Sequence, residues 1–142
     1  MRLWHKDLIP VLPRQQLLGQ WRECCLIAKS LAETGTPNHL LVNKITDYEP
    51  KHFYNYCRLV CEEMQQRGYK VNAQAVQLWL DMITDCSHEF VPNDELFFGW
   101  HTDEYLKICY YNLKEKFLCG GIPYSEWNGL STYVVTALGV TL

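Results

Sequence analysis

Several common features are missing from this chain of 142 residues. No apolar run approaches the roughly 18 residues that span a bilayer, and the N-terminus lacks the basic-then-apolar pattern of a secretory signal peptide. There is no internal repeat and no low-complexity tract. We therefore expect a cytoplasmic protein without a membrane partner. Its hydrophobic content of 48% is sufficient for one folded domain over residues 1–142.

The chain also lacks the usual patterns of a metal or disulfide site. No CxxC motif occurs, the five histidines are scattered, and the seven cysteines are odd in number, unlike a secreted disulfide framework. Reduced cysteine acts as a small hydrophobe on helical stripes. Five cysteines lie on or beside such stripes: Cys24, Cys25, Cys57, Cys61 and Cys109. We expect neither a metal nor a cofactor.

An excess of positive charge is absent as well. The chain has 13 Lys and Arg residues against 16 Asp and Glu residues, a net charge of −3, which argues against nucleic-acid binding by bulk electrostatics. The charge is unevenly distributed, with +3 over residues 1–30, zero over 31–70 and −6 over 71–142. Positive charge is therefore concentrated in the first thirty residues.

Apolar residues recur with helical spacing along most of the chain. The pattern predicts helices over 13–33, 50–68 and 73–83, and from 103 to the Gly120-Gly121 pair, with breakers between them. Residues 36–49 are expected to form a loop, and 84–100 have no clear period. Residues 122–142 have no assigned element, and Val and Thr in the final ten are consistent with a short strand, a packed tail or a frayed end. The prediction is a compact all-α domain of three long helices plus one shorter helix.

The first predicted helix has two distinct faces. Its apolar stripe consists of Leu17, Trp21, Cys24, Ala28 and Leu31. At 100° per residue, the opposite face carries Gln15, Gln16, Gly19, Arg22 and Glu23. Two amides and a guanidinium suit an anionic ligand that forms hydrogen bonds, and the carboxylate stays available for chemistry. The alternative is a mixed-charge face that only meets solvent.

Two segments resemble the pyrimidine-dimer DNA glycosylase family. A short N-terminus, MRLW, precedes LPRQQLLGQWRE at residues 12–23, and LVCEEMQQRGYKV at 59–71 is similar to the family's second helix and its stop. The resemblance covers about residues 1–120, with the specific signal in 1–27 and 52–71, and is greater to the bacterial branch that opens MRLW. It implies a compact helical fold with an N-terminal arm threaded between helices.

The resemblance also implies the catalytic residues. In this family the nucleophile is the N-terminal α-amine and its partner is a helix-one glutamate, which correspond here to Met1 and Glu23. Methionine aminopeptidases require a small second residue, so Arg2 predicts that Met1 is retained. A peptide α-amine has a pKa of about 7.7–8.0, against roughly 10.4 for lysine, so more of it is neutral and nucleophilic at pH 7.

The expected partner is double-stranded DNA with a damaged or abasic site, bound by a monomer. By resemblance, Arg2 and Arg22 hold phosphates, supported by amides. The full set of expected DNA-binding residues is Arg2, Trp4, Arg14, Gln15, Gln16 and Arg22. The sequence departs from the family at Leu26, at Gln16 and in a tail without basic residues after Lys116, which predicts fewer phosphate contacts. The alternative function is a non-catalytic module that binds nucleic acid or protein.

Overall fold

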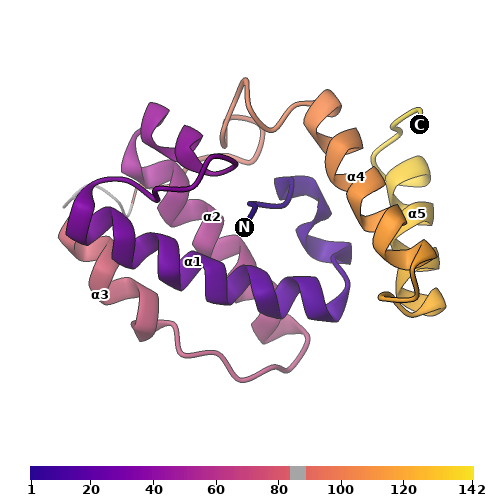
Figure 1. Cartoon of the computed structure of the whole chain (residues 1–142), viewed down its shortest axis with the longest axis horizontal. Helices are drawn as coiled ribbons and strands as arrows, with labels where there is room; N and C mark the ends of the chain where they lie inside the picture. The colour runs from indigo at the N-terminus through magenta and orange to yellow at the C-terminus, as the bar shows by residue number, and fades with distance from the viewer. Residues whose placement is uncertain (84–88) are drawn as a thin grey trace.

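The computed structural model describes residues 1–83 and 89–142, except for the side chains of 78–80, 82 and 83. All regular structure in these ranges is helical (Figure 1), which confirms the all-α prediction. In chain order the elements are the 3-10 helix η1 (Lys6–Val11), α1 (Arg14–Thr34), the 3-10 helix η2 (Asn43–Asp47), α2 (Pro50–Gln66), α3 (Gln74–Ile83), α4 (Asp103–Leu118) and α5 (Tyr124–Thr136). Residues 84–88, part of the segment without a period, lie outside the described residues.

The apolar stripes of α1 and α2 point into one core, as predicted. On α1, Leu31 is half-buried and the other four stripe residues are buried. On α2 the whole predicted stripe is buried: Phe53, Tyr56, Cys57, Val60, Cys61 and Met64. Helix α1 ends at Gly35, whose φ of 76° is left-handed and whose N–H donates to the Leu31 carbonyl. This residue lets the chain turn away without the strain that a side chain would add there.

The C-terminal segment corrects the sequence-based prediction. Residues 122–142 include the helix α5, which was not predicted. Of the final ten residues, 133–136 belong to α5 and not to a strand, and Leu138 and Val140 beyond it pack against the core. Its buried residues Trp127, Leu130 and Val134 lie on one face, and the Trp127 ring stacks on Phe117 of α4 with a centroid distance of 5.3 Å. Glu126 Oε1 also accepts a hydrogen bond from the Arg14 backbone N–H at 2.8 Å. A carboxylate of α5 thus caps the N-terminus of α1.

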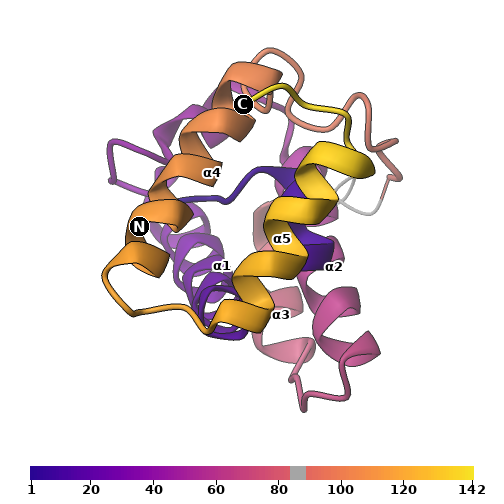
Figure 2. The same cartoon turned by 90° about the vertical axis from the view of Figure 1, so that its right-hand side faces the viewer.

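The N-terminal residues 1–12 form an arm that runs through the middle of the molecule. Figures 1 and 2 show it between the α1–α2 pair and the α4–α5 pair, which confirms the predicted threading. Leu3, Leu8 and Leu12 are almost fully buried. At the far end of the arm, the Arg67 guanidinium of α2 donates hydrogen bonds to the carbonyls of Leu12 (2.8 Å), Ile9 and Pro10. The arm is therefore part of the core and not a flexible leader.

Other expectations concern cysteines, metals and membranes. The described cysteines are free thiols, and those on the α1, α2 and α4 stripes are buried except Cys25, which is half-buried. Within the described ranges, no three His, Cys, Asp or Glu residues are grouped as metal ligands would be. No helix of the described chain combines the length and apolar character required to cross a bilayer.

Candidate active site

Side chains of α1 hold the backbone of the arm in place. The Arg2 backbone N–H donates to Glu23 Oε2 at 3.3 Å. Gln20 is 1% exposed and bonds the arm twice, because its Oε1 accepts from the Trp4 N–H (2.8 Å) and its Nε2 donates to the Arg2 carbonyl (3.0 Å). The amide of Gln20 thus satisfies two backbone groups of the arm that would otherwise need other hydrogen-bond partners. These bonds fix the direction in which the chain approaches Met1.

Two tyrosines complete this support from other helices. The Tyr56 hydroxyl of α2 donates to the Trp4 carbonyl at 2.6 Å, and its oxygen also lies 3.0 Å from Gln20 Oε1. The Tyr105 hydroxyl of α4 donates to the Leu3 carbonyl at 2.7 Å. Burial raises the pKa of both tyrosines, so each hydroxyl keeps the proton that it donates. Three helices therefore hold residues 2–4.

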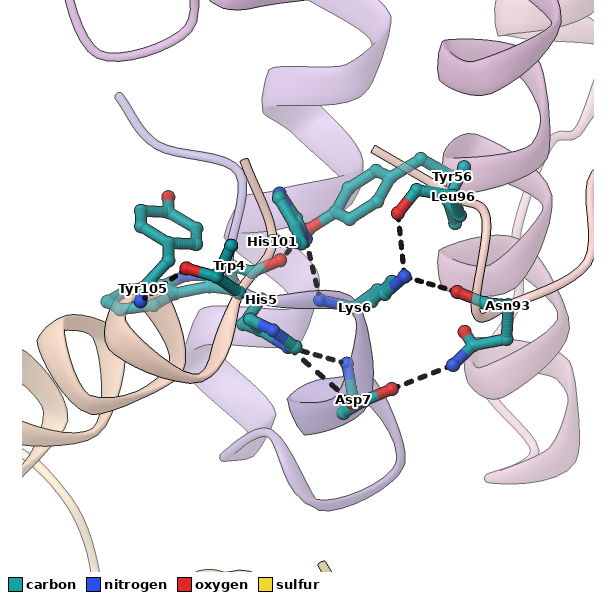
Figure 3. A network of polar contacts seen from close by, with 10 residues as sticks. Trp4, His5, Lys6, Asp7, Tyr56, Asn93, Leu96, His101 and Tyr105 are labelled. Carbon is teal, nitrogen blue, oxygen red and sulfur yellow. Dashed lines mark hydrogen bonds and ion pairs between the residues drawn. The ribbon is translucent and has the colours of Figure 1, made fainter. Parts of the chain in front are cut away.

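A second polar network lies further along the arm (Figure 3). The Lys6 backbone N–H donates to His101 Nδ1 at 3.0 Å, and the Lys6 ammonium donates to the carbonyls of Leu96 (2.7 Å) and Asn93. Lys6 is 6% exposed, and burial lowers its pKa. His5 and His101 are buried with stacked rings 5.1 Å apart. His101, which comes just before α4, is thus a core residue.

A pocket opens at the start of the arm. Its volume is about 290 Å³, near the lower end of the range for ligand sites. It is lined by Met1, Arg2 and Trp4 from the arm, Glu23 from α1, Leu41 from the loop after α1, and Asn112 and Lys116 from α4. We call this the Met1 pocket. A pocket of about 410 Å³ between the end of α1, η2 and α2 contains none of the predicted site residues.

The electrostatics of the Met1 pocket are dominated by Arg2. Its guanidinium carbon lies 5.6 Å from the centroid of the Trp4 ring, within the range of a cation–π interaction. Burial raises the pKa of Tyr105 and of Cys109, and the Arg2 charge partly offsets that effect on both. Among the side chains that line the pocket, Arg2 and Lys116 are cationic and Glu23 is a carboxylate. An anionic sugar–phosphate chain could therefore meet two positive charges beside one carboxylate.

The structure brings only half of the predicted site residues together. Met1, Arg2, Trp4 and Glu23 line the Met1 pocket, whereas the remaining four do not. Those four are Arg14, Gln15, Gln16 and Arg22, of which all but the half-buried Gln16 are exposed. The Arg14 guanidinium lies over the Tyr69 ring, 5.6 Å from its centroid. At Gly19, an added Cβ would lie 3.8 Å from the Arg22 guanidinium, its nearest neighbour.

Sequence reasoning did not identify several residues that build the site. Gln20, Tyr56 and Tyr105 position the arm, while Asn112 lines the pocket from α4. Lys116 also lines the pocket, and its place in the sequence fits either a phosphate contact or an ordinary surface position. Gln20 had a signal in the sequence, because it lies three residues from Leu17 and four from Cys24, inside the apolar stripe. A glutamine at a core position indicates a buried hydrogen-bonding role. The α4 residues had no such signal, since only the fold brings them to the arm.

The buried histidines predict a pH dependence of stability. Burial lowers the pKa of His5, His52 and His101 below the usual 6.5, although Asp7 and Asp103 oppose this at His5. The unfolded chain then binds more protons than the folded chain below pH 6.5. The free energy of unfolding should therefore be highest above pH 6.5 and fall as the pH drops. The slope should approach about 1.4 kcal/mol per pH unit for each extra proton bound on unfolding.

Urea unfolding between pH 7.5 and 5.5 measures this slope. His101→Asn keeps an acceptor for the Lys6 N–H and removes one titrating group, so its slope should be smaller. His39→Gln removes an exposed histidine and should keep the wild-type slope. Equal slopes for all three proteins would contradict the assignment.

Comparison with known proteins gives a family match. A family model described as pyrimidine dimer DNA glycosylase matches residues 1–77, which is more than half of the 142 residues. The matched part contains the arm, α1 and α2, and with them every residue of the Met1 pocket except the two from α4. No curated protein and no solved structure matches the chain significantly. On the family match, the chain belongs to the pyrimidine dimer DNA glycosylase family.

Proposed function

We propose that this protein removes damaged bases from double-stranded DNA and then cleaves the strand at the resulting abasic site. The α-amine of Met1 is the nucleophile and Glu23 is its catalytic partner. The proposed lesion is the pyrimidine dimer, in keeping with the family. The observation that carries the proposal is the 3.3 Å hydrogen bond from the Arg2 N–H to Glu23, because it holds the carboxylate one residue from the α-amine.

The proposed chemistry has two stages. The neutral amine attacks C1′ of the damaged nucleotide, the glycosidic bond breaks, and the base leaves with its electron pair. Glu23 stabilises the positive charge that develops on the sugar. The ring oxygen then leaves C1′, so that the sugar ring opens and an imine joins C1′ to the Met1 nitrogen. Loss of a C2′ proton to Glu23 expels the 3′ phosphate by β-elimination, and water hydrolyses the imine to free the amine.

The proposed phosphate contacts come from both sides of the Met1 pocket. Arg2 and Lys116 line it, and Arg22 is exposed one residue before Glu23 on α1. Arginine and lysine at such positions neutralise phosphates and fix the register of the duplex without reading its sequence. Arg14, Gln15 and Gln16 lie outside the pocket, so we propose that they contact only DNA that extends along α1.

Borohydride trapping tests the proposal directly. The protein is incubated with a duplex that contains one abasic site, and borohydride reduces any imine to a stable amine link. Peptide mapping then locates the link. We expect the adduct at Met1, in protein whose free terminus has been verified by mass spectrometry.

Two modified proteins show whether the adduct forms on the Met1 amine. Lys116 is the second amine that lines the pocket, so Lys116→Ala should weaken binding but keep the adduct at Met1. Protein with an acetylated terminus should give no adduct. An adduct that maps to Lys116, or one that survives acetylation, would reject Met1 as the nucleophile. Folded protein with a free terminus and no adduct would favour the binding module instead.

A further inference from the structure

Two leucines stand exposed at the edge of the Met1 pocket. Leu40 is 85% exposed and Leu41 is 47% exposed. Leu41 lines the Met1 pocket and also an adjoining pocket of about 360 Å³, to which Leu40, Lys44, Trp100 and Ile108 contribute. The two pockets therefore meet at Leu41, and the leucines form an apolar ridge beside the proposed reaction site.

The loop that carries the leucines is tightly bonded. The His39 carbonyl accepts hydrogen bonds from the backbone N–H groups of Val42 (3.0 Å) and Asn43 (2.9 Å). Asn43 Oδ1 in turn accepts from the His39 N–H at 2.8 Å. Val42 and Ile45 are buried in the core. The fold thus buries the next apolar residues but holds the two leucines outward, where no residue that the structure describes covers their exposed surface.

The surroundings of the ridge indicate the chemistry of that partner. Arg2 and Lys116 lie on the Met1-pocket side of Leu41, and Lys44 lies on the other side. Two carboxylates, Glu23 and Glu104, accompany these three cations in the lining of the two pockets. An apolar ridge between cations matches a base stack, which is apolar inside and carries phosphates on both strands.

We propose that Leu40 and Leu41 form a wedge that enters the base stack next to the damaged nucleotide. The inference rests on the proposed function, since it assumes that the nucleotide's sugar reaches Met1. A base must leave the stack before the amine can reach C1′, and the gap that it leaves is unfavourable. Apolar side chains that insert between base steps fill such a gap and hold the duplex kinked. Of the two leucines, Leu41 lies closer to the reacting sugar because it lines the Met1 pocket, and Leu40 enters the stack further from that sugar.

The test compares duplex and single-stranded DNA. Leu40→Ala, at the leucine that does not line the Met1 pocket, is expected to lower the rate of borohydride trapping on an abasic duplex by about tenfold or more. Its rate on the same abasic strand without a complement should stay within about twofold of wild type, because there is no stack to open. A 2-aminopurine beside the abasic site should brighten with wild-type protein and much less with the variant.

Matched variants distinguish the loss of wedge insertion from a general loss of trapping activity. Leu40→Met keeps apolar bulk at the same position and should trap on duplex DNA at close to the wild-type rate. Val135→Ala removes an exposed apolar side chain from α5 and should leave both rates unchanged.

Three outcomes would overturn the wedge. Equal losses on both DNA forms would mean that the leucines shape the Met1 pocket itself. Unchanged trapping on duplex DNA would mean that the leucines do not enter the base stack, and would favour a protein as their partner. Absence of trapping by wild-type protein on both DNA forms would reject the proposed function and, with it, the wedge.

Discussion

Replacing Glu23 by glutamine is expected to slow base release by about 10²–10⁴-fold. The carboxylate charge would no longer stabilise the developing positive charge on the sugar, and no group beside the amine could accept the C2′ proton. The fold should survive, because the glutamine Oε1 can still accept the hydrogen bond that the Arg2 N–H now gives to Glu23. Single-turnover cleavage of the glycosidic bond in an irradiated oligonucleotide, read as strand breaks after alkali treatment, measures the first effect, and thermal unfolding measures the second.

A second carboxylate on the same helix provides the control for this variant. Glu33 is exposed near the end of α1 and does not line the Met1 pocket. Glu33→Gln changes the net charge by the same amount and should release bases at the wild-type rate. If Glu23→Gln kept wild-type turnover, Glu23 would be removed from the mechanism. If it instead lowered the melting temperature strongly, the carboxylate would be a structural anchor of the arm.

The largest effect on stability is expected from Gln20→Leu. Leucine fills a similar volume but pairs with neither the Trp4 N–H nor the Arg2 carbonyl. Each buried backbone group left without a partner costs roughly 1–3 kcal/mol, so the free energy of unfolding should fall by about 3 kcal/mol. The arm should also lose its fixed position, and trapping at Met1 should fall under conditions in which the variant is still folded. Urea unfolding and borohydride trapping measure the two effects.

Gln16→Leu is the matched control for stability. Gln16 is on the same helix, and its Oε1 is buried without a hydrogen-bond partner among the described residues. Leucine there removes an unsatisfied polar atom, so the variant should be as stable as wild type or more stable. Equal destabilisation by both substitutions would show that the cost comes from packing and not from the bonds of Gln20 to the arm.

Sequence periodicity located the helices where an apolar stripe recurs without interruption. The helices predicted over 13–33, 50–68 and 73–83 differ from α1, α2 and α3 by one or two residues at their ends. The helix α5 was missed because its stripe of Trp127, Leu130 and Val134 is short, and its sequence includes Gly129 and β-branched residues that weaken helix propensity. Packing against α4 and η1 decides its structure, and that information is distributed over distant parts of the chain.

The candidate site was predictable only in part, for a related reason. Met1, Arg2 and Glu23 were found from a resemblance of local motifs, and the structure brings all three to one pocket. Lys116 and Asn112 come from α4, more than a hundred residues from the arm, and no local pattern links them to it. His101 was equally hidden from local patterns, because it lies outside the predicted helices and yet is buried in the core.

The threaded arm has a consequence for the order of events during synthesis. The side-chain hydrogen bonds that tie the arm to the helices join residues from 16 to 102 positions apart, the longest being that between Leu3 and Tyr105. Contacts of such long range form slowly, since a large loop must close first. The arm leaves the ribosome early but cannot be seated until α4 has emerged as well. The amine that we propose as the nucleophile is therefore positioned among the last steps of folding, and an incomplete chain carries it without its partners.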